Sequence, residues 1–158
     1  MSRTTRATKF LDKAGVRYSV LTYDYDPNAE RIGLQAAEAL GVDPRRVLKT
    51  LMAEVDGKAV CVVVPSDQEV SMKKLAAAFG GKSARMMPPA DAERLSGYHV
   101  GGISPFGQKR QLPTAVEQNA MNEASVCMNG GQRGVQVQLA PQDAVQALRA
   151  RVASLRAE

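Results

Sequence analysis

The residues with the clearest chemical potential form one loop, Gly101-Gly102-Ile103-Ser104-Pro105-Phe106-Gly107-Gln108-Lys109-Arg110. Its glycines let the backbone approach a ligand closely, because they carry no side chain and tolerate positive φ. Successive backbone N–H groups in such a loop can bind an oxyanion or a carbonyl oxygen. The loop therefore predicts a site built on backbone donors. Ser104 either adds its hydroxyl to that site or is only a turn residue.

A second candidate is Lys49, which lies within the strand-like apolar run Val47-Leu48-Lys49-Thr50-Leu51-Met52. Alternation along a strand predicts that Val47, Lys49 and Leu51 share one face, where core residues point. Such a lysine either holds an anion at a mouth of the sheet or is a charge on an edge strand that blocks aggregation. The pattern alone leaves both interpretations open.

The usual catalytic groups are scarce. The sequence has one histidine, so a multi-histidine metal centre cannot form, and we expect no metal or other cofactor. Cys61 lies in an apolar run that would bury its thiol and raise its pKa. Ser104 precedes a proline and lies outside a GxSxG elbow. The chemistry is therefore expected to depend on backbone donors and Lys49.

Composition limits the class of protein. The 158 residues, of which 44% are hydrophobic, predict one folded domain over residues 1–158. No apolar run reaches the ~18 residues of a membrane-spanning helix. Together with two cysteines outside any CxxC pair and the lack of a secretory signal, this predicts a cytoplasmic protein without a membrane partner. A net charge of +5 favours polyanionic partners, whereas three Phe, four Tyr and no Trp argue against stacking along a single RNA strand. Contact with phosphates and one recognised end is the expected mode.

Hydrophobic periodicity places these candidates on interspersed helices and strands. Turn signals at Asp56-Gly57 and at Asn129-Gly130-Gly131 predict two hairpins, which require antiparallel pairing. The expected fold is mixed α/β, a largely antiparallel sheet or small barrel with helices outside. Expected helices are 8–14, 29–40, 71–79, 89–95 and a last helix from Pro141 that carries Val145, Leu148, Val152 and Leu155. Expected strands are 16–25, 47–55, 58–64, 98–103, 125–128 and 135–139.

Three motifs in this order resemble the YbaK/EbsC family: Val47-Leu48-Lys49-Thr50-Leu51, the loop from Gly101 to Gln108, and the turn Gly131-Gln132-Arg133-Gly134. The resemblance extends from about Thr5 to Ala153. This family contains free-standing aminoacyl-tRNA deacylases related to the editing domain of bacterial prolyl-tRNA synthetases. It implies a barrel-like mixed sheet and the removal of a wrong amino acid from the 3′ end of tRNA, most often Cys from tRNA-Pro. Mischarged tRNA is then the expected partner, with prolyl-tRNA synthetase as a candidate second partner.

The resemblance also implies roles for single residues. Lys49 matches a family lysine near the terminal adenosine and the scissile ester, Thr50 matches its neighbour, and Tyr23 matches a pocket tyrosine. The loop residues Gly101, Gly102, Ile103, Ser104 and Pro105 match the segment whose backbone approaches the ester. In the family, the thiol of a mischarged cysteine is thought to attack its own carbonyl and displace the tRNA. A substrate without a thiol would need a water or a ribose hydroxyl instead.

Two positions depart from the cysteine-specific pattern and leave the amino acid open. Asn129 stands where a serine often occurs, and Gln136 stands where an aspartate can occur. Three hypotheses therefore remain: a deacylase for Cys-tRNA(Pro) or for another small amino acid, a non-catalytic module that binds a tRNA end or a synthetase, and a binder of small nucleotides.

Overall fold

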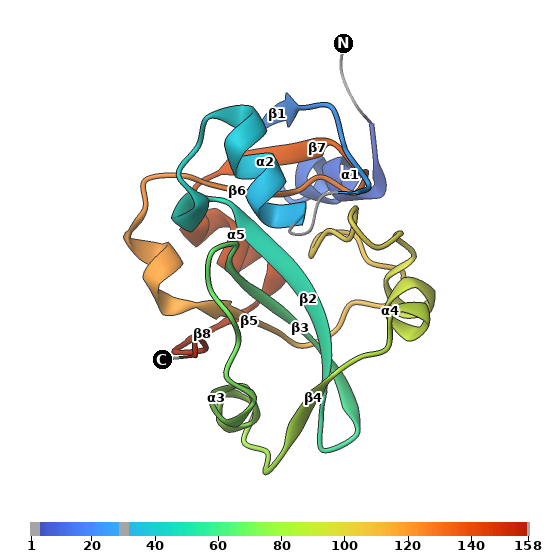
Figure 1. Ribbon diagram of the computed structural model, residues 1–158, viewed down its shortest axis with the longest axis vertical. Helices are drawn as coiled ribbons and strands as arrows, with labels where there is room; N and C mark the ends of the chain where they lie inside the picture. The colour runs from blue at the N-terminus through green and yellow to red at the C-terminus, as the bar shows by residue number, and fades with distance from the viewer. Residues whose placement is uncertain (1–3, 29–31, 158) are drawn as a thin grey trace.

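A computed structural model describes residues 4–28 and 32–157 (Figure 1). Its α-helices are α1 (Arg6–Lys13), α2 (Ile32–Leu40), α3 (Met72–Ala78), α4 (Pro89–Ser96) and α5 (Pro141–Leu148). Short 3-10 helices are η1 (Pro44–Arg46) and η2 (Gln118–Asn122). The strands are β1 (Ser19–Thr22), β2 (Leu48–Val55), β3 (Lys58–Pro65), β4 (Ala84–Met86), β5 (Thr114–Glu117), β6 (Val126–Asn129), β7 (Val135–Leu139) and β8 (Arg151–Ala153). The start expected for the second helix, at residue 29, lies outside the described residues.

The strands form two sheets that meet at one point. A three-stranded antiparallel sheet has the order β1-β7-β6, and a five-stranded sheet has the order β4-β2-β3-β5-β8. In the second sheet, β2 pairs antiparallel with β3 and β4, whereas β3–β5 and β5–β8 are parallel. A parallel bridge from Val47 to Cys127 connects the start of β2 to β6. The mixed α/β class and both predicted hairpins are confirmed.

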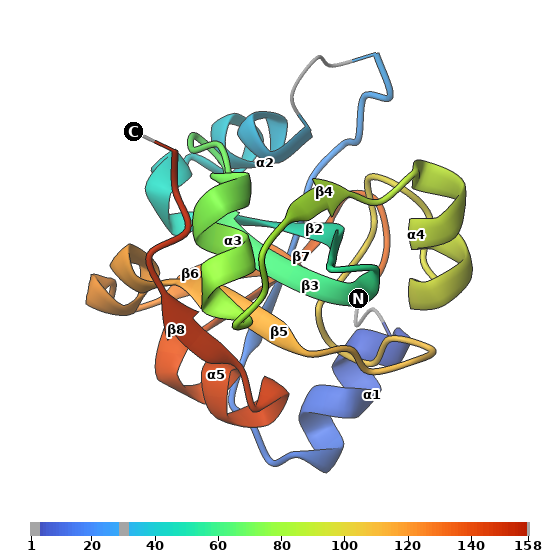
Figure 2. The same cartoon turned by 90° about the horizontal axis from the view of Figure 1, so that it is seen from below.

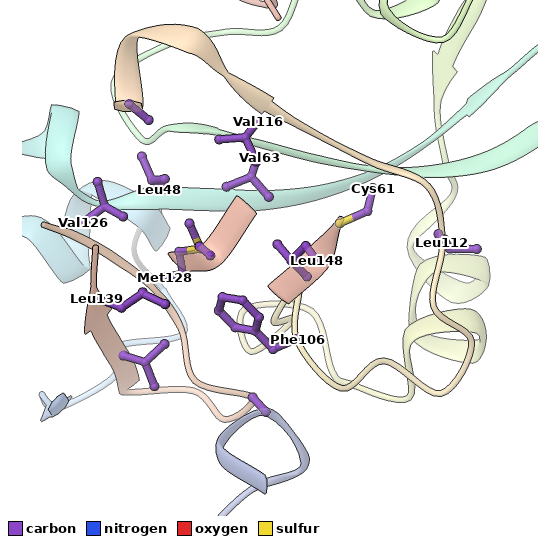
Figure 3. Close-up of a cluster of buried hydrophobic side chains, with 14 of the residues drawn as sticks. Leu48, Cys61, Val63, Phe106, Leu112, Val116, Val126, Met128, Leu139 and Leu148 are labelled. Atoms are coloured by element: carbon purple, nitrogen blue, oxygen red, sulfur yellow. The ribbon is translucent and has the colours of Figure 1, made fainter. Parts of the chain in front are cut away.

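The main core lies between the two sheets (Figure 3). Leu48, Met52 and Val63 enter it from the five-stranded sheet, and Met128 and Val137 enter it from the three-stranded sheet. Helices α1 and α5 and the fully buried Phe106 close its ends. Because both sheets contribute one face to the same core, the interior is barrel-like, as the resemblance implied.

The opposite face of the five-stranded sheet packs against α3, which lies across β3 in Figure 2. Leu75 and Ala76 of α3 contact a layer that includes Val62 and Val64 of β3. The Ser71 side chain caps α3 by accepting a hydrogen bond from the Lys74 N–H at 3.2 Å, as its sequence position predicted. Strand β3 is therefore buried on both faces, which explains its continuous apolar sequence.

Two predicted elements are wrong. Residues 98–103 form no strand but a looped segment, in which the Val100 N–H donates to the Glu93 carboxylate at 2.8 Å. The last helix ends at Leu148, because Arg149 adopts a left-handed conformation with φ of 53°. The chain then forms β8 beside β5, so Val152 lies in a strand and is 44% exposed. The short strands β4, β5 and β8 were not predicted.

Candidate functional site

The candidate site lies at a gap in the outer edge of β2. Strand β4 pairs with β2 only over Ala53–Val55, and the bridge to β6 lies at Val47. Between these points, residues 48–52 of β2 have no strand along this edge within the described part of the chain. The long β2 strand thus carries an open stretch of backbone between the two sheets (Figure 1).

The backbone of Thr50 faces this gap. The Met52 carbonyl accepts a hydrogen bond from the Met87 N–H at 3.0 Å, on the side of β2 that faces away from β3. In an antiparallel ladder, residues two apart turn their N–H and C=O groups to the same edge. Thr50, two residues before Met52, therefore presents an N–H and a carbonyl to the gap, where they can bind a ligand.

A cavity of about 330 Å³ occupies the gap. Among the predicted site residues, Lys49 and Thr50 of β2, Gly101 and Ile103 of the loop, and Tyr23 line it. Asn129 at the end of β6 and Gln136 of β7 complete this part of the wall. The remaining lining residues were not predicted: Val47, Leu48, Leu51, Met52, Met86, Met87, Pro89, Ala92 and Val100. All nine are apolar, so an apolar cavity carries a few polar groups, as in a small-molecule site.

Three polar atoms of the cavity wall are buried without a hydrogen-bond partner: the Tyr23 phenol oxygen, Thr50 Oγ1 and Gln136 Oε1. Unpaired buried polar atoms cost free energy, so their concentration in one cavity favours a polar ligand there. Burial raises the pKa of Tyr23, with a smaller contribution from the neighbouring Tyr25. The phenol therefore stays protonated at neutral pH and can donate a hydrogen bond.

The glycine loop is held tightly against this cavity. Gly101 has a φ of +91°, and a Cβ there would lie 2.5 Å from the Tyr25 phenol oxygen. Asn129 Nδ2 donates to the Gly101 carbonyl at 3.2 Å, and Asn129 Oδ1 accepts from the Gly131 N–H at 2.7 Å. The asparagine side chain thus joins the loop to the β6–β7 turn. A residue with a side chain could not occupy position 101 without moving Tyr25.

The other loop residues with predicted roles lie away from the cavity wall. The Gly102 N–H donates to the His99 carbonyl at 2.8 Å, so in this conformation it is not free to bind an oxyanion. Fully buried Ser104 accepts a hydrogen bond from the Phe106 N–H at 3.1 Å. Its carbonyl accepts from Gln108 Nε2 at 2.9 Å. The cavity lining does not include Gly102, Ser104 or Pro105. The hydrogen bonds of Ser104 fit its interpretation as a turn residue.

Lys49 reaches the site from the face of β2 that packs toward α3. Leu51, on the same face, packs against the apolar cluster beneath α3, whereas Val47 packs against α2 and Cys127. The Lys49 side chain is 22% exposed, and its Nζ lies 3.9 Å from Oε1 of Glu69, which is 77% exposed. This long ion pair at the surface is weak. The ammonium is therefore only weakly held by Glu69, and Lys49 itself is one of the residues that line the cavity.

Other candidate groups have structural surroundings. Both cysteines are free and buried, as predicted, and burial raises the pKa of the Cys61 thiol to about 12. Within residues 4–28 and 32–157, no group of three or more His, Cys, Asp or Glu side chains could hold a metal ion. None of the helices in these same ranges has the length and apolar character needed to span a bilayer.

Tyr25 and Arg133 were not among the predicted site residues, although Arg133 belongs to the motif from Gly131 to Gly134. Tyr25 lies two residues after Tyr23, which places both rings on one side of an extended segment. The Arg133 guanidinium stacks over the Tyr25 ring at 5.4 Å from its centroid, and Arg133 Nε donates to the Val100 carbonyl at 2.9 Å. Their contact depends on two segments far apart in sequence, which no local pattern reveals.

A comparison with protein families gives the context of this cavity. A family model described as the aminoacyl-tRNA editing domain matches residues 26–147. The chain belongs to this family. The editing-domain match spans α2 to α5 and includes the Lys49 edge, the glycine loop and the β6–β7 turn.

Individual relatives agree with this assignment. A protein of Enterococcus faecalis described as a putative Cys-tRNA(Pro)/Cys-tRNA(Cys) deacylase, EbsC, is 35% identical over 141 residues, which cover 87% of this chain and 84% of the relative. Proline–tRNA ligase of Limosilactobacillus fermentum is 27% identical over 119 residues, 72% of this chain but 21% of the ligase. The crystal structure of a putative trans-editing enzyme for prolyl-tRNA synthetase superposes with a TM-score of 0.82 at 22% identity, over 99% of this chain and 100% of that one. This last likeness supports the fold.

Proposed function

We propose that this editing domain is a trans-acting aminoacyl-tRNA deacylase that clears mischarged tRNA, with Cys-tRNA(Pro) as its main substrate. The family match and the 35% identity to EbsC support the reaction class. The observation that carries the proposal is the cavity at the open edge of β2, where Lys49, the Thr50 backbone and Gly101 meet. An aminoacyl ester is small, uncharged at its carbonyl and flanked by hydrogen-bonding groups, and it therefore matches an apolar cavity that carries a few polar groups.

Groups on the cavity wall can stabilise the negative charge that develops on the ester carbonyl oxygen. Thr50 presents its backbone N–H to the gap, and we assign a second donor to the N–H of Gly101, which lines the cavity. Loss of one oxyanion donor typically costs about 3 kcal/mol of transition-state stabilisation. The Lys49 ammonium adds positive charge at the same edge. With the Gly102 N–H occupied by His99, Gly101 and Thr50 are the donors that we assign to the ester carbonyl.

The substrate supplies the nucleophile. The described residues that line the cavity include no cysteine, histidine, serine or carboxylate. For a cysteinyl ester, the thiol sulfur attacks its own carbonyl carbon and a C–S bond forms. The C–O bond to the ribose then breaks, and the ribose oxygen leaves with the thiol proton as the amino acid departs as a thiolactone. For an ester without a thiol, water takes the place of sulfur and the free amino acid is released.

The test compares two lysines of the same hairpin. Lys49→Ala removes the cation at the cavity, and Lys58→Ala removes an exposed cation at the far end of β3. We expect Lys49→Ala to lower the rate of cysteine release from Cys-tRNA(Pro) about 100-fold, an effect of the size of one lost charge-stabilising group. Lys58→Ala should match the wild type. Wild-type rates in Lys49→Ala, with the fold intact by circular dichroism, would overturn the role of Lys49.

Two contacts favour a second candidate, a non-catalytic module that binds the tRNA end. The Gly102 N–H is already bonded within the loop, and the Asn129 amide is engaged by both Gly101 and Gly131. A pure binder would protect or ignore the ester. Cysteine would then leave Cys-tRNA(Pro) no faster than in buffer at any protein concentration.

A further inference from the structure

Arg133 is an exposed cation fixed at the rim of the cavity. Its Nε donates to the Val100 carbonyl at 2.9 Å, and its guanidinium carbon lies 5.4 Å from the centroid of the Tyr25 ring. Val100 lines the cavity, and a Cβ on Gly101 would lie 3.3 Å from Arg133 Nε. These contacts place the guanidinium beside the glycine loop, at the edge of the opening.

The two contacts leave the outer part of the guanidinium available. Stacking uses one ring face, and the hydrogen bond uses Nε, so both terminal Nη groups remain. Within residues 4–28 and 32–157, Arg133 has no carboxylate within ion-pair distance, whereas Arg45, Arg85 and Arg94 each have at least one. A planar guanidinium with two free Nη groups binds a phosphate in a bidentate manner.

We propose that Arg133, stacked on Tyr25, binds a phosphodiester of the tRNA acceptor end while the attached aminoacyl ester occupies the cavity. The proposal rests on the proposed function, because it assigns the ester to the cavity. A terminal nucleotide whose ester enters between Gly101 and Thr50 must leave its 5′ phosphate outside, at the rim. The rim position beside Gly101 is where Arg133 lies.

The geometry favours binding because the side chain is already ordered. An arginine normally loses rotamer freedom when it binds, and this cost is reduced when a ring and a carbonyl already fix it. Lys49 lies on the β2 side of the same cavity, whereas Arg133 lies beside the loop. The two cations would therefore hold the nucleotide from different sides of the opening.

The experiment compares two substrates that differ in phosphate. Cysteine release is measured from Cys-tRNA(Pro) and from 3′-cysteinyl adenosine, which carries the same ester without any phosphodiester. We expect Arg133→Ala to lower kcat/KM for the tRNA about tenfold, the size of one charge-assisted contact, and to leave the adenosine ester unchanged. Arg133→Lys should give an intermediate loss on the tRNA, because a lysine keeps the charge without the bidentate fork.

Arg151 offers a matched control. It also stacks on a ring, at 4.8 Å from the Phe79 centroid, and donates to a carbonyl, that of Ala78 at 3.0 Å. It lies on β8, at the opposite edge of the five-stranded sheet from β4. Arg151→Ala should therefore deacylate both substrates at wild-type rates. In addition, loss of one phosphate contact should make the slope of log affinity against log salt less steep by about one in Arg133→Ala alone.

The outcomes separate this proposal from the proposed function. An equal loss on both substrates would mean that Arg133 only positions the loop, and no loss on the tRNA would remove it from binding; either result overturns the proposal. If the wild type releases cysteine from neither substrate, the proposed function fails. Arg133 is then tested by binding of an uncharged acceptor minihelix, which Arg133→Ala should weaken about tenfold. Equal minihelix binding by the variant and the wild type would overturn the phosphate contact.

Discussion

A methyl group at Gly101 is the sharpest local perturbation of the cavity. In Gly101→Ala, the residue keeps a φ of +91°, and the new Cβ lies 2.5 Å from the Tyr25 phenol oxygen. The backbone conformation costs an alanine about 1–2 kcal/mol. The contact with Tyr25 adds a second cost, because the ring that must move is stacked by Arg133. The loop or the ring shifts, and the Gly101 N–H leaves the position that we assign to the ester carbonyl.

Gly80→Ala isolates the first cost from the second. Gly80 has a φ of +68°, and a Cβ there would meet nothing within 4 Å. Gly80→Ala should lose about 1–2 kcal/mol in the free energy of unfolding, which corresponds to about 2–8 °C in Tm, and Gly101→Ala should lose more because of its contact with Tyr25. Only Gly101→Ala should also lose activity, by about 100-fold in kcat for cysteine release, the cost of a displaced oxyanion donor.

The assay pairs urea unfolding with deacylation of Cys-tRNA(Pro) under native conditions. The reasoning is refuted if Gly101→Ala retains wild-type kcat, because its N–H would then have no part in the reaction. It is also refuted if Gly80→Ala loses as much activity as Gly101→Ala. General destabilisation would in that case explain both results.

Two further predictions concern stability. Fully buried Glu117 accepts hydrogen bonds from the N–H groups of Asn119, Leu155 and Arg156 at 2.8, 2.8 and 3.2 Å. Glu117→Ala should therefore lower the free energy of unfolding, measured in urea, by about 3 kcal/mol or more. An unchanged urea midpoint would contradict this role. Burial raises the Cys61 pKa from 9.0 to about 12, so between these pH values the unfolded chain loses a proton that the folded protein keeps, and stability falls as pH rises. The fall should be shallower in Cys61→Ala when urea midpoints are measured from pH 8 to 11, and identical slopes would refute this assignment.

Local signals predicted much of the fold. The Asp56-Gly57 turn forms with φ values of 50° and 82°, and Gly97 ends α4 in the left-handed conformation with φ of 79°. Such turns and caps depend on neighbouring residues, so the sequence shows them directly. The two β-hairpins and the mixed class followed from these signals.

The C-terminal segment could not be predicted because distant contacts determine it. Val145, Leu148, Val152 and Leu155 fit a helical stripe, yet the helix ends at Leu148 without a glycine to mark the end. The following residues pair with β5, and the buried Glu117 carboxylate binds the N–H of Leu155. A short parallel strand beside another short strand leaves no local pattern, and its stability comes from tertiary pairing.

The sequence identified residues of the candidate site better than it predicted their arrangement. Tyr23, Lys49, Gly101 and Gln136 line one cavity. They come from distant parts of the sequence, and they could be predicted because the family resemblance identified them as a set. The open edge of β2 was not predicted, since it depends on where β4 stops pairing. The hydrogen bond from the Gly102 N–H to the His99 carbonyl was not predicted either, because the sequence suggested a strand over residues 98–103 where the chain forms a turn.

The central claim is that this editing domain accelerates ester cleavage on mischarged tRNA. The most direct measurement is the rate of amino acid release from a panel of aminoacyl-tRNAs that includes Cys-tRNA(Pro), Ala-tRNA(Pro) and Ser-tRNA(Pro), with and without prolyl-tRNA synthetase. We predict release of cysteine from Cys-tRNA(Pro) well above its spontaneous rate, and slower release of serine, whose hydroxyl is a weaker nucleophile than a thiol. Decay of every ester at its spontaneous rate, in the presence and absence of the synthetase, would contradict the account.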